Sequence, residues 1–289
     1  MRIGNLSGRL TIFTDEGAVD VERASGGRFG ADPQAVYQRW PEFVGWAATA
    51  PLNGAAVPFP DTELGPPAPR PGQVFAIGLN YRDHAAEAGF DLPQTLTVFT
   101  KFVSSFAGPT GEVVLAGSTV DWEVELVAVI GRRAHQVVPE DAWDHIAGLT
   151  VGQDLSERTV QMAGPAPQFS LGKSFPGFSP MGPWLVTPDE FEDRDDLALG
   201  CSINGEAVQK GRTSDLVFPV PALIAELSAV VPLEPGDIIF TGTPAGVGAA
   251  RRPPRYLAAG EELVSWIEGI GEMRHQLVAT ADLMLGAHQ

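Results

Sequence analysis

The sequence is short of cysteine, of positive charge and of long apolar runs, and each shortage excludes a class of protein. A single cysteine, Cys201, rules out an intrachain disulfide and favours a reducing compartment, which we expect to be the cytoplasm. The chain has 36 acidic against 19 basic residues, a net charge of −17, so neither nucleic acid nor an anionic membrane is an expected partner. No run approaches the roughly 18 apolar residues of a membrane helix, and we see no signal peptide at the start.

What the chain does have is a large apolar fraction and many short segments typical of strands. Of its 289 residues 44% are hydrophobic, which is enough for a sizeable core. Strands are expected at 74–78, 112–115, 122–130, 184–186, 197–203, 237–241 and 262–267, and helices at 80–88, 139–147 and 221–230. Because strands outnumber helices and do not alternate regularly with them, we predict a mixed, largely antiparallel α+β fold, predominantly β, rather than a TIM barrel or a Rossmann fold.

A proline-rich segment over residues 65–72 divides the chain into two expected domains. Before it, residues 10–13 and 18–21 flank a turn and predict a hairpin, which one or two short helices follow over 33–47. We therefore predict a small N-terminal domain, residues 1–70, and a catalytic domain, residues 71–289. The alternative is that the proline-rich segment is an ordered surface loop within one domain.

Two glutamates in a run typical of a strand, Glu123 and Glu125, give the strongest chemical signal. Alternate residues of a strand point to the same face, so both carboxylates share a face with Val127 and Val129. Two carboxylates on an apolar face repel each other and are costly to desolvate, and a cation between them removes both penalties. With Asp154 as a third ligand, these oxygen donors favour Mg²⁺, Mn²⁺ or Ca²⁺ over zinc. The alternative is a glutamate pair on a solvated sheet face.

His84 and Glu87 are three residues apart in a stretch that we expect to be helical, so their side chains would be neighbours. A carboxylate beside an imidazole fixes the tautomer and raises the basicity of the ring, which suits a general base that activates water. The alternative is a surface histidine next to an acidic residue. The other histidines lack metal-ligand spacing, so a zinc site is not expected.

Two further features suit an anionic substrate. Lys173 lies between apolar residues, where its ammonium would neutralise an anion, although an ordinary exposed lysine is the alternative. Residues 241–248 follow a predicted strand and are rich in glycine and small hydroxyls, so their backbone N–H groups can bind a carboxylate. The segment lacks the Lys-Ser/Thr ending of a P-loop, and nucleotide binding is therefore not expected.

Six segments, in this order along the chain, resemble the fumarylacetoacetate hydrolase family. They are GLNYRDH (78–84), DWEVEL (121–126), GQDLSER (152–158), LGKSF (171–175), MGPWLV (181–186) and EPGDIIFTGTPAGVG (234–248). The resemblance covers residue 74 to the C-terminus and is strongest to the small-subunit, acylpyruvate hydrolase-like branch. It implies a mixed β-sandwich roll with a metal at one mouth, usually in a homodimer, preceded by a variable N-terminal domain.

The resemblance also implies roles for the residues that could carry chemistry. The three carboxylates would hold one Mg²⁺ or Mn²⁺ per subunit, and Lys173 would contact the substrate carboxylate or its developing enolate. His84 and Glu87 match the acid–base dyad that the small-subunit branch carries on a mobile lid.

Four more residues match positions that line the substrate site of the family. They are Arg158, Gln161, Thr243 and Lys101. Thr243 matches the loop threonine that binds the substrate carboxylate. Lys101 is followed by Phe102, where the branch more usually has proline, so its match is the weakest of the four.

The substrate that the resemblance implies is a 2-oxo or 2,4-dioxo acid. Its carboxylate and 2-oxo oxygens would chelate the cation, which would stabilise the enolate that forms when the C3–C4 bond breaks. Glu87 would orient His84, and His84 would take a proton from water, which makes the protein a hydrolase of C–C bonds. The same site could instead decarboxylate oxaloacetate, or isomerise or hydrate a 2-hydroxy-dienoate.

Two alternatives are not enzymes. A metal-binding protein that has lost catalysis would keep the carboxylates but lack the dyad or the lysine, and both are present here. A calcium-stabilised β-rich protein would bind Ca²⁺ with roughly six to eight oxygen ligands, and it leaves Lys173 unexplained.

Overall fold

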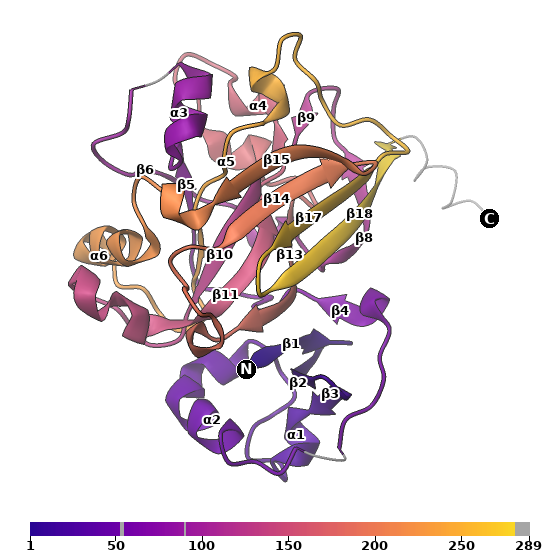
Figure 1. Ribbon diagram of the computed structural model, residues 1–289, viewed down its shortest axis with the longest axis vertical. Coiled ribbons are helices and arrows are strands. Elements are labelled where there is room, and N and C mark those ends of the chain that lie inside the picture. Colours follow the sequence, from indigo (N-terminus) through magenta and orange to yellow (C-terminus); the bar gives the residue numbers. More distant parts are fainter. Residues whose placement is uncertain (53–54, 90, 281–289) are drawn as a thin grey trace.

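Two layers of β-sheet form the body of the molecule, and the N-terminal residues build a smaller lobe beside it (Figure 1). The computed structural model describes residues 1–52, 55–89 and 91–280. Strands dominate its regular structure and helices are short, which confirms the predicted mixed, predominantly β fold.

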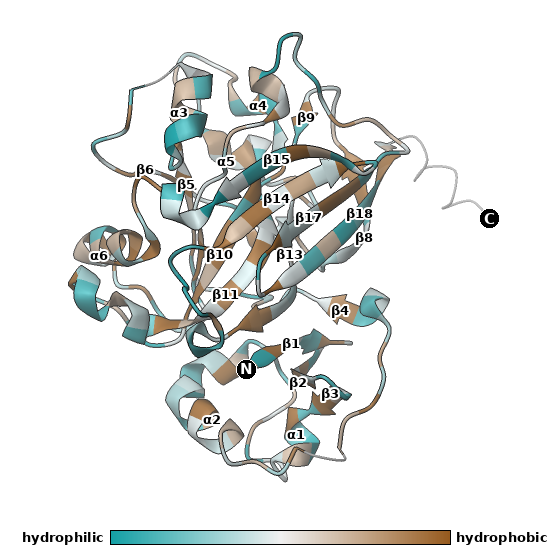
Figure 2. Cartoon of the chain, in the orientation of Figure 1, coloured by the Kyte–Doolittle hydropathy of each residue, from teal (hydrophilic) through white to brown (hydrophobic). Residues whose placement is uncertain are grey.

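Eleven strands form the main sheet. In spatial order they are β3 (Gly17–Asp20), β2 (Arg9–Thr14), β1 (Arg2–Leu6), β13 (Ser179–Val186), β11 (Ile146–Gln153), β10 (Val124–Ile130), β16 (Ile238–Phe240), β5 (Val74–Gly78) and β6 (Thr97–Phe99), with β4 (Leu64–Gly65) beside β1 and β7 (Phe106–Ala107) beside β13. The pairs are antiparallel except β16 with β5 and β13 with β7. Hydrophobic residues dominate β10, which is buried along its whole length (Figure 2).

A second sheet covers one face of β10, β11 and β13. Its strands are, in order, β15 (Glu206–Arg212), β14 (Ala198–Ile203), β17 (Glu262–Ile267), β18 (Gly271–Ala279) and β8 (Thr110–Leu115). Leu126 of β10 packs in one core cluster with Leu199 of β14 and Leu263 of β17, and all three are fully buried. A short ladder of β9 (Val120–Asp121) and β12 (Ser156–Glu157) lies at the end of this core, next to the site.

The N-terminal lobe both extends the main sheet and has aromatic packing of its own. Strand β1 pairs with β13 in the register Arg2↔Val186. Helices α1 (Val21–Ala24) and α2 (Trp40–Ala47) close the lobe, where Phe29 and Phe43 meet edge to face with 5.4 Å between ring centroids. The boundary after residue 70 stays a prediction.

The remaining helices are short. They are α3 (Arg82–Ala88), α4 (Arg158–Gln161), α5 (Phe169–Gly172) and α6 (Val220–Val230), with 3₁₀ turns at Ala35–Arg39, Asp61–Glu63, Val103–Ser105, Pro139–His145, Pro188–Glu190, Thr213–Asp215 and Gly248–Ala250. Among the described residues, no helix has both the length and the apolar character needed to cross a membrane.

The structure corrects two sequence predictions of local structure. The helix expected over 139–147 is a 3₁₀ turn that ends at His145, because the apolar residues from Ile146 onward pair on both sides as β11. The strand expected over 122–130 is interrupted at Trp122 and Glu123, where the N–H of Glu123 donates to the side-chain oxygen of Gln153 at 2.9 Å instead of to a backbone carbonyl.

The start of β10 and the end of β11 position the functional site. Glu125 lies opposite Gly152 in this antiparallel pair. A Cβ at position 152 would lie 2.4 Å from Val127 Cγ2 and 2.9 Å from Phe240 Cε1, so only glycine allows the two strands to pack this closely against β16.

Candidate metal and acid–base site

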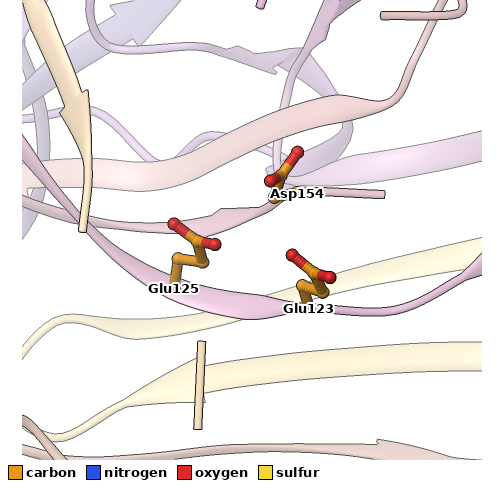
Figure 3. A group of neighbouring side chains, drawn as sticks. All are labelled: Glu123, Glu125 and Asp154. Carbon is orange, nitrogen blue, oxygen red and sulfur yellow. The ribbon is translucent and has the colours of Figure 1, made fainter. Parts of the chain in front are cut away.

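Three carboxylates converge where β10 meets β11. Glu125 belongs to β10, Glu123 immediately precedes it, and Asp154 follows β11. The backbone N–H of Asp154 donates to the carbonyl of Glu123 at 2.9 Å, which fixes the third carboxylate beside the first two. One oxygen from each residue lies within 4.8 Å of the others, and Figure 3 shows Glu123 and Glu125 extending from one segment toward Asp154. All three residues are buried.

The carboxylates of Glu123 and Glu125 lie in opposite electrostatic environments. Burial alone would raise the pKa of Glu123, but the charges of Lys173 and Arg158 outweigh burial and lower its pKa to about 2. Burial also raises the pKa of Glu125, and the negative charges of Asp154 and Glu123 raise it further, well above its ordinary value. Glu125 is therefore the carboxylate for which the protein supplies too little positive charge.

Lys173, directly after α5, places its ammonium between two of the carboxylates. Its Nζ donates to Glu123 Oε2 at 2.8 Å, to Asp154 Oδ2 at 2.6 Å and to Ser156 Oγ at 2.7 Å. Burial alone would lower the pKa of Lys173, but Asp154 and Glu123 outweigh it and raise the pKa, so the ammonium stays charged.

Lys101 lies behind Asp154 and its side chain has no exposed surface. Its Nζ contacts Asp154 Oδ1 at 2.5 Å and donates to the carbonyl of Lys173. Burial lowers the pKa of Lys101, and the positive charge of Lys173 adds to that effect while Asp154 opposes it. Lys101 thus holds Asp154 from the side opposite to the cavity.

Arg158 and Gln161 extend the cluster at α4. Glu157 caps this short helix by accepting from the N–H of Val160. Arg158 pairs with Asp121 Oδ2 and with Glu123 Oε1, both at 2.7 Å, and its Nη1 donates to Gln161 Oε1 at 2.9 Å. Helix α4 therefore orients a guanidinium that fixes Glu123 from the side.

The buried charges of the cluster leave one negative charge uncompensated. The carboxylates are Asp121, Glu123, Glu125 and Asp154, and the cations are Lys101, Lys173 and Arg158. A divalent cation fits this arrangement, because three buried hard oxygen donors lie within 4.8 Å of one another and Glu125 forms no ion pair with a described residue. Glu123, Glu125 and Asp154 are the residues that could hold it.

The loop expected to bind a carboxylate, residues 241–248, binds carboxylates of the protein itself. The N–H of Gly242 donates to Glu125 Oε2 at 2.8 Å. Thr243 lines the cavity with 3% of its surface exposed, donates to the carbonyl of Val124 and accepts from the side-chain amide of Gln209, both at 2.8 Å. These contacts fix the loop against the start of β10.

His84 and Glu87 face the same cavity from α3, whose first turn is hydrophilic (Figure 2). His84 Nδ1 lies 3.6 Å from Glu87 Oε2, too far for a hydrogen bond, and has no partner among the described residues. Glu87 instead accepts from the N–H of Gly246 at 3.0 Å. Burial alone would raise the pKa of Glu87, but His84, the Gly246 amide and Arg251 outweigh it and lower the pKa.

A cavity of about 780 Å³ joins the carboxylate cluster to α3. Of the residues predicted from the sequence, those that line it are Glu123, Glu125, His84, Glu87, Lys173, Arg158, Gln161 and Thr243. Asp154 and Lys101 lie behind this surface and act on it through Lys173 and Glu123.

Sequence reasoning missed three buried residues that organise the site. Asp121 anchors Arg158 and accepts from the N–H of Gly248 at 2.7 Å. Gln153 and Gln209 each accept from a backbone N–H at the start of β10. Asp121 and Gln153 stand within segments already noted, 121–126 and 152–158, so a signal was available for both, whereas Gln209 has no sequence pattern of its own.

Comparison with known proteins identifies the family. The family model described as fumarylacetoacetate (FAA) hydrolase C-terminal matches residues 73–278. The chain belongs to the fumarylacetoacetate hydrolase family. The match contains every residue assigned above to the site of this family member.

Three relatives show the range of the fumarylacetoacetate hydrolase family. The human oxaloacetate tautomerase FAHD2A, mitochondrial, is 44% identical over 214 residues, which span 73% of this chain and 68% of the human protein. A solved structure from Mycobacterium smegmatis is 55% identical, has a TM-score of 0.91, and aligns over 97% of this chain and 100% of that one. Maleylpyruvate hydrolase from Sphingobium sp. SYK-6, solved with manganese(II) and pyruvate, is 28% identical with a TM-score of 0.75, over 96% of this chain and 99% of that one.

Proposed function

We propose that this protein is a divalent-metal enzyme that moves a proton at C3 of a 2-oxo acid, interconverting the keto and enol forms. The observation that carries the proposal is that His84 and a buried carboxylate cluster with one uncompensated charge face the same cavity. The similarity to oxaloacetate tautomerase supports the type of reaction. The manganese(II) and pyruvate in the hydrolase relative support the cation and the class of ligand.

Glu123, Glu125 and Asp154 would hold Mg²⁺ or Mn²⁺. Bound there, the cation would supply Lewis-acid polarisation of the carboxylate and 2-oxo oxygens of the substrate. Lys173 and Arg158 keep Glu123 ionised and oriented, and Lys173 also lines the cavity, where its positive charge attracts an anionic substrate.

His84 is the group that we assign to proton transfer. It would take the C3 proton of the keto form, leaving an electron pair that spreads onto the 2-oxo oxygen, and protonation of that oxygen completes the enol. No atom is gained or lost. Its free Nδ1 and half-buried position suit a ring that must both accept and release a proton.

Hydrolysis of a 2,4-dioxo acid is a second candidate, and the position of Glu87 favours it. A small side-chain rotation would close the 3.6 Å gap to His84 Nδ1 and form a dyad. His84 would then take a proton from water while the oxygen bonds to C4. The C3–C4 bond breaks, its electron pair stays on C3 as an enolate, and a proton returns to that carbon. Decarboxylation of oxaloacetate shares the enolate and needs no water.

A substrate panel separates these reactions. Ketonisation of the enol form of oxaloacetate, release of pyruvate from oxaloacetate and release of pyruvate from an acylpyruvate are measured with Mn²⁺ and with EDTA. The proposal predicts EDTA-sensitive ketonisation that is lost in His84→Ala and kept in Asp83→Asn, an exposed neighbour on the same helix. Cleavage of the acylpyruvate without ketonisation would replace the tautomerase with the hydrolase. Activity on none of the three would contradict both.

The family resemblance also leads us to propose a homodimer. Light scattering on the purified chain measures its mass directly, and a monomer would contradict this part of the proposal.

A further inference from the structure

Two arginines line a part of the cavity wall to which the proposed reaction assigns no role. Arg251 and Arg252 both line it, in the segment that follows the loop at 241–248. The other cations of the lining, Arg158 and Lys173, are paired with carboxylates, whereas Arg251 and Arg252 form no ion pair with any carboxylate in the described part of the chain. In a protein with a net charge of −17, two guanidiniums that form no ion pair within the described residues give this cavity wall a local potential that favours anions.

The protein fixes Arg251 in place before any ligand arrives. Its Nη2 donates to the carbonyl of Val208 at 3.1 Å, and the guanidinium lies over the Trp122 ring with 5.3 Å to the centroid. Nε is buried and has no acceptor among the described residues. Nη1 forms no hydrogen bond with the described residues, so its two N–H groups remain for a ligand. Since the group is already oriented, binding a carboxylate costs little further side-chain entropy.

Arg251 lies near Glu87 on the lining of the cavity. Its Nη2 reaches the carbonyl of Gly246 at 3.5 Å, and the N–H of the same residue binds Glu87. The charge of Arg251 also contributes to lowering the pKa of Glu87, which agrees with this closeness. A molecule that extends from the cluster past His84 toward Glu87 therefore comes near Arg251, and Arg252 lines the same cavity.

We propose that the Arg251 and Arg252 wall is a second anion site that selects 2-oxo dicarboxylates over 2-oxo monocarboxylates of the same length. The proposal rests on the proposed function, because that function places the 2-oxo carboxylate at the cluster. The distal carboxylate binds the arginine pair through charge-assisted hydrogen bonds. The cavity of about 780 Å³ has room for a chain that spans both ends.

Matched ligand pairs test the site by equilibrium binding, without cleavage of the ligand. 2-Oxoglutarate and 2-oxopentanoate have the same five-carbon chain and differ in the distal carboxylate, and 2-oxoadipate and 2-oxohexanoate are the six-carbon pair. None carries the C4 carbonyl that cleavage requires. Titration calorimetry with the Mn²⁺-loaded full chain measures the affinity of each. We expect at least one diacid to bind about 10- to 100-fold more tightly than its monoacid partner, which is the range for a hydrogen-bonded charge.

Three substitutions locate the effect. Arg252→Gln removes an exposed guanidinium, and Arg251→Gln removes the oriented one. Arg255→Gln is the matched control, because Arg255 belongs to the same segment but pairs with Glu206 at 3.0 Å and does not line the cavity. We expect the preference for the diacid to shrink to less than threefold in Arg251→Gln, to shrink partly in Arg252→Gln and to persist in Arg255→Gln. Thermal unfolding checks that each variant is folded, and if Arg251→Gln is not, Arg252→Gln and Arg251→Lys decide.

The outcomes separate this inference from the proposed function. Equal binding of diacid and monoacid by the wild type, or an unchanged preference in both arginine variants, overturns the anion site. If EDTA leaves the affinities unchanged but the preference still follows Arg251 and Arg252, the anion site stands and the placement of the 2-oxo carboxylate at a metal fails.

Discussion

The two chemical walls of the cavity are built in different ways. The carboxylate wall is anchored at the junction of two central strands, and buried cations hold two of its three carboxylates. The histidine wall is a helix of seven residues, α3, in which His84 Nδ1 has no partner among the described residues and Glu87 is bound to a loop amide. The carboxylate wall is preorganised for a cation. In the histidine wall, His84 and Glu87 lie near each other but are not hydrogen-bonded.

This difference assigns the walls different tasks. Fixed, desolvated charges suit binding and polarisation, which gain from rigidity. Proton transfer needs a group that can change partners, and a short surface helix with few fixed contacts provides one. Substitutions in the carboxylate wall should therefore abolish metal binding, and substitutions in the histidine wall should slow turnover while the metal stays bound.

The largest effect is expected for Glu125→Gln. Replacing this carboxylate by a neutral amide removes the proposed ligand that has no ion-pair partner among the described residues, so the metal-dependent rate should fall by about 10³-fold or more. Steady-state assays over a range of Mn²⁺ measure the loss. Glu112→Gln, an exposed glutamate of β8, is the control and should keep wild-type rates. Recovery of full activity at high Mn²⁺ would mean that Glu125 only tunes the affinity.

His84→Ala should lower kcat by about 10²- to 10⁴-fold, because it removes the group assigned to proton transfer. Manganese affinity should stay within about threefold of the wild type, since no hydrogen bond or ion pair links His84 to the three carboxylates in the described part of the chain. Turnover close to the wild-type rate would refute the role of His84. Loss of Mn²⁺ binding would mean that the histidine wall also contributes to holding the metal.

Glu87→Gln should have a smaller effect, about tenfold on kcat. The amide oxygen of glutamine can still accept from Gly246, so α3 stays docked, but the negative charge beside His84 is lost. Thermal unfolding should be nearly unchanged, which separates an electrostatic role from a structural one. An unchanged kcat would restrict Glu87 to anchoring the helix.

The free energy of unfolding of the metal-free protein should show the cost of burying the ionised Glu125 carboxylate beside two other carboxylates. The folded state raises the pKa of Glu125 above its ordinary value of 4.5, so the folded form binds its proton more tightly than the unfolded form. The stabilisation from that proton is complete below pH 4.5 and is lost as the pH rises through the raised pKa. Denaturant unfolding in EDTA should find Glu125→Gln more stable than the wild type at neutral pH, by about 1 kcal/mol or more, but not at pH 4. Parallel stability curves for the two proteins would contradict the raised pKa.

The carboxylate wall was also the part of the site most accessible from the sequence. The alternation of β10 places Glu125 on the face of Val127 and Val129. Glu123 lies just before the strand, and its carboxylate is still within 4.8 Å of that of Glu125. The main strands follow from their apolar runs, so the predicted fold class is confirmed. The 3₁₀ turn at Pro139–His145 was mistaken for the start of a helix because pairing with two neighbouring strands, rather than local preference, decides where β11 begins.

The contacts that no sequence pattern marks are long-range ones. Lys101 reaches Asp154 only because β6, α5 and the end of β11 meet in the fold. Arg251 stands in a stretch of arginine and proline typical of an exposed loop, and only the packing against Trp122 places it on the cavity. Such contacts depend on tertiary packing, and the periodicity of hydrophobic residues along the sequence does not predict them.

Manganese binding to three forms of the protein tests the central claim most directly. Electron paramagnetic resonance of free Mn²⁺ is followed during titration of the wild type, Glu125→Gln and His84→Ala. The two-wall account predicts one bound ion per chain in the wild type and in His84→Ala, and no binding by Glu125→Gln at the same concentrations. Equal binding by Glu125→Gln, or loss of binding in His84→Ala, would contradict it.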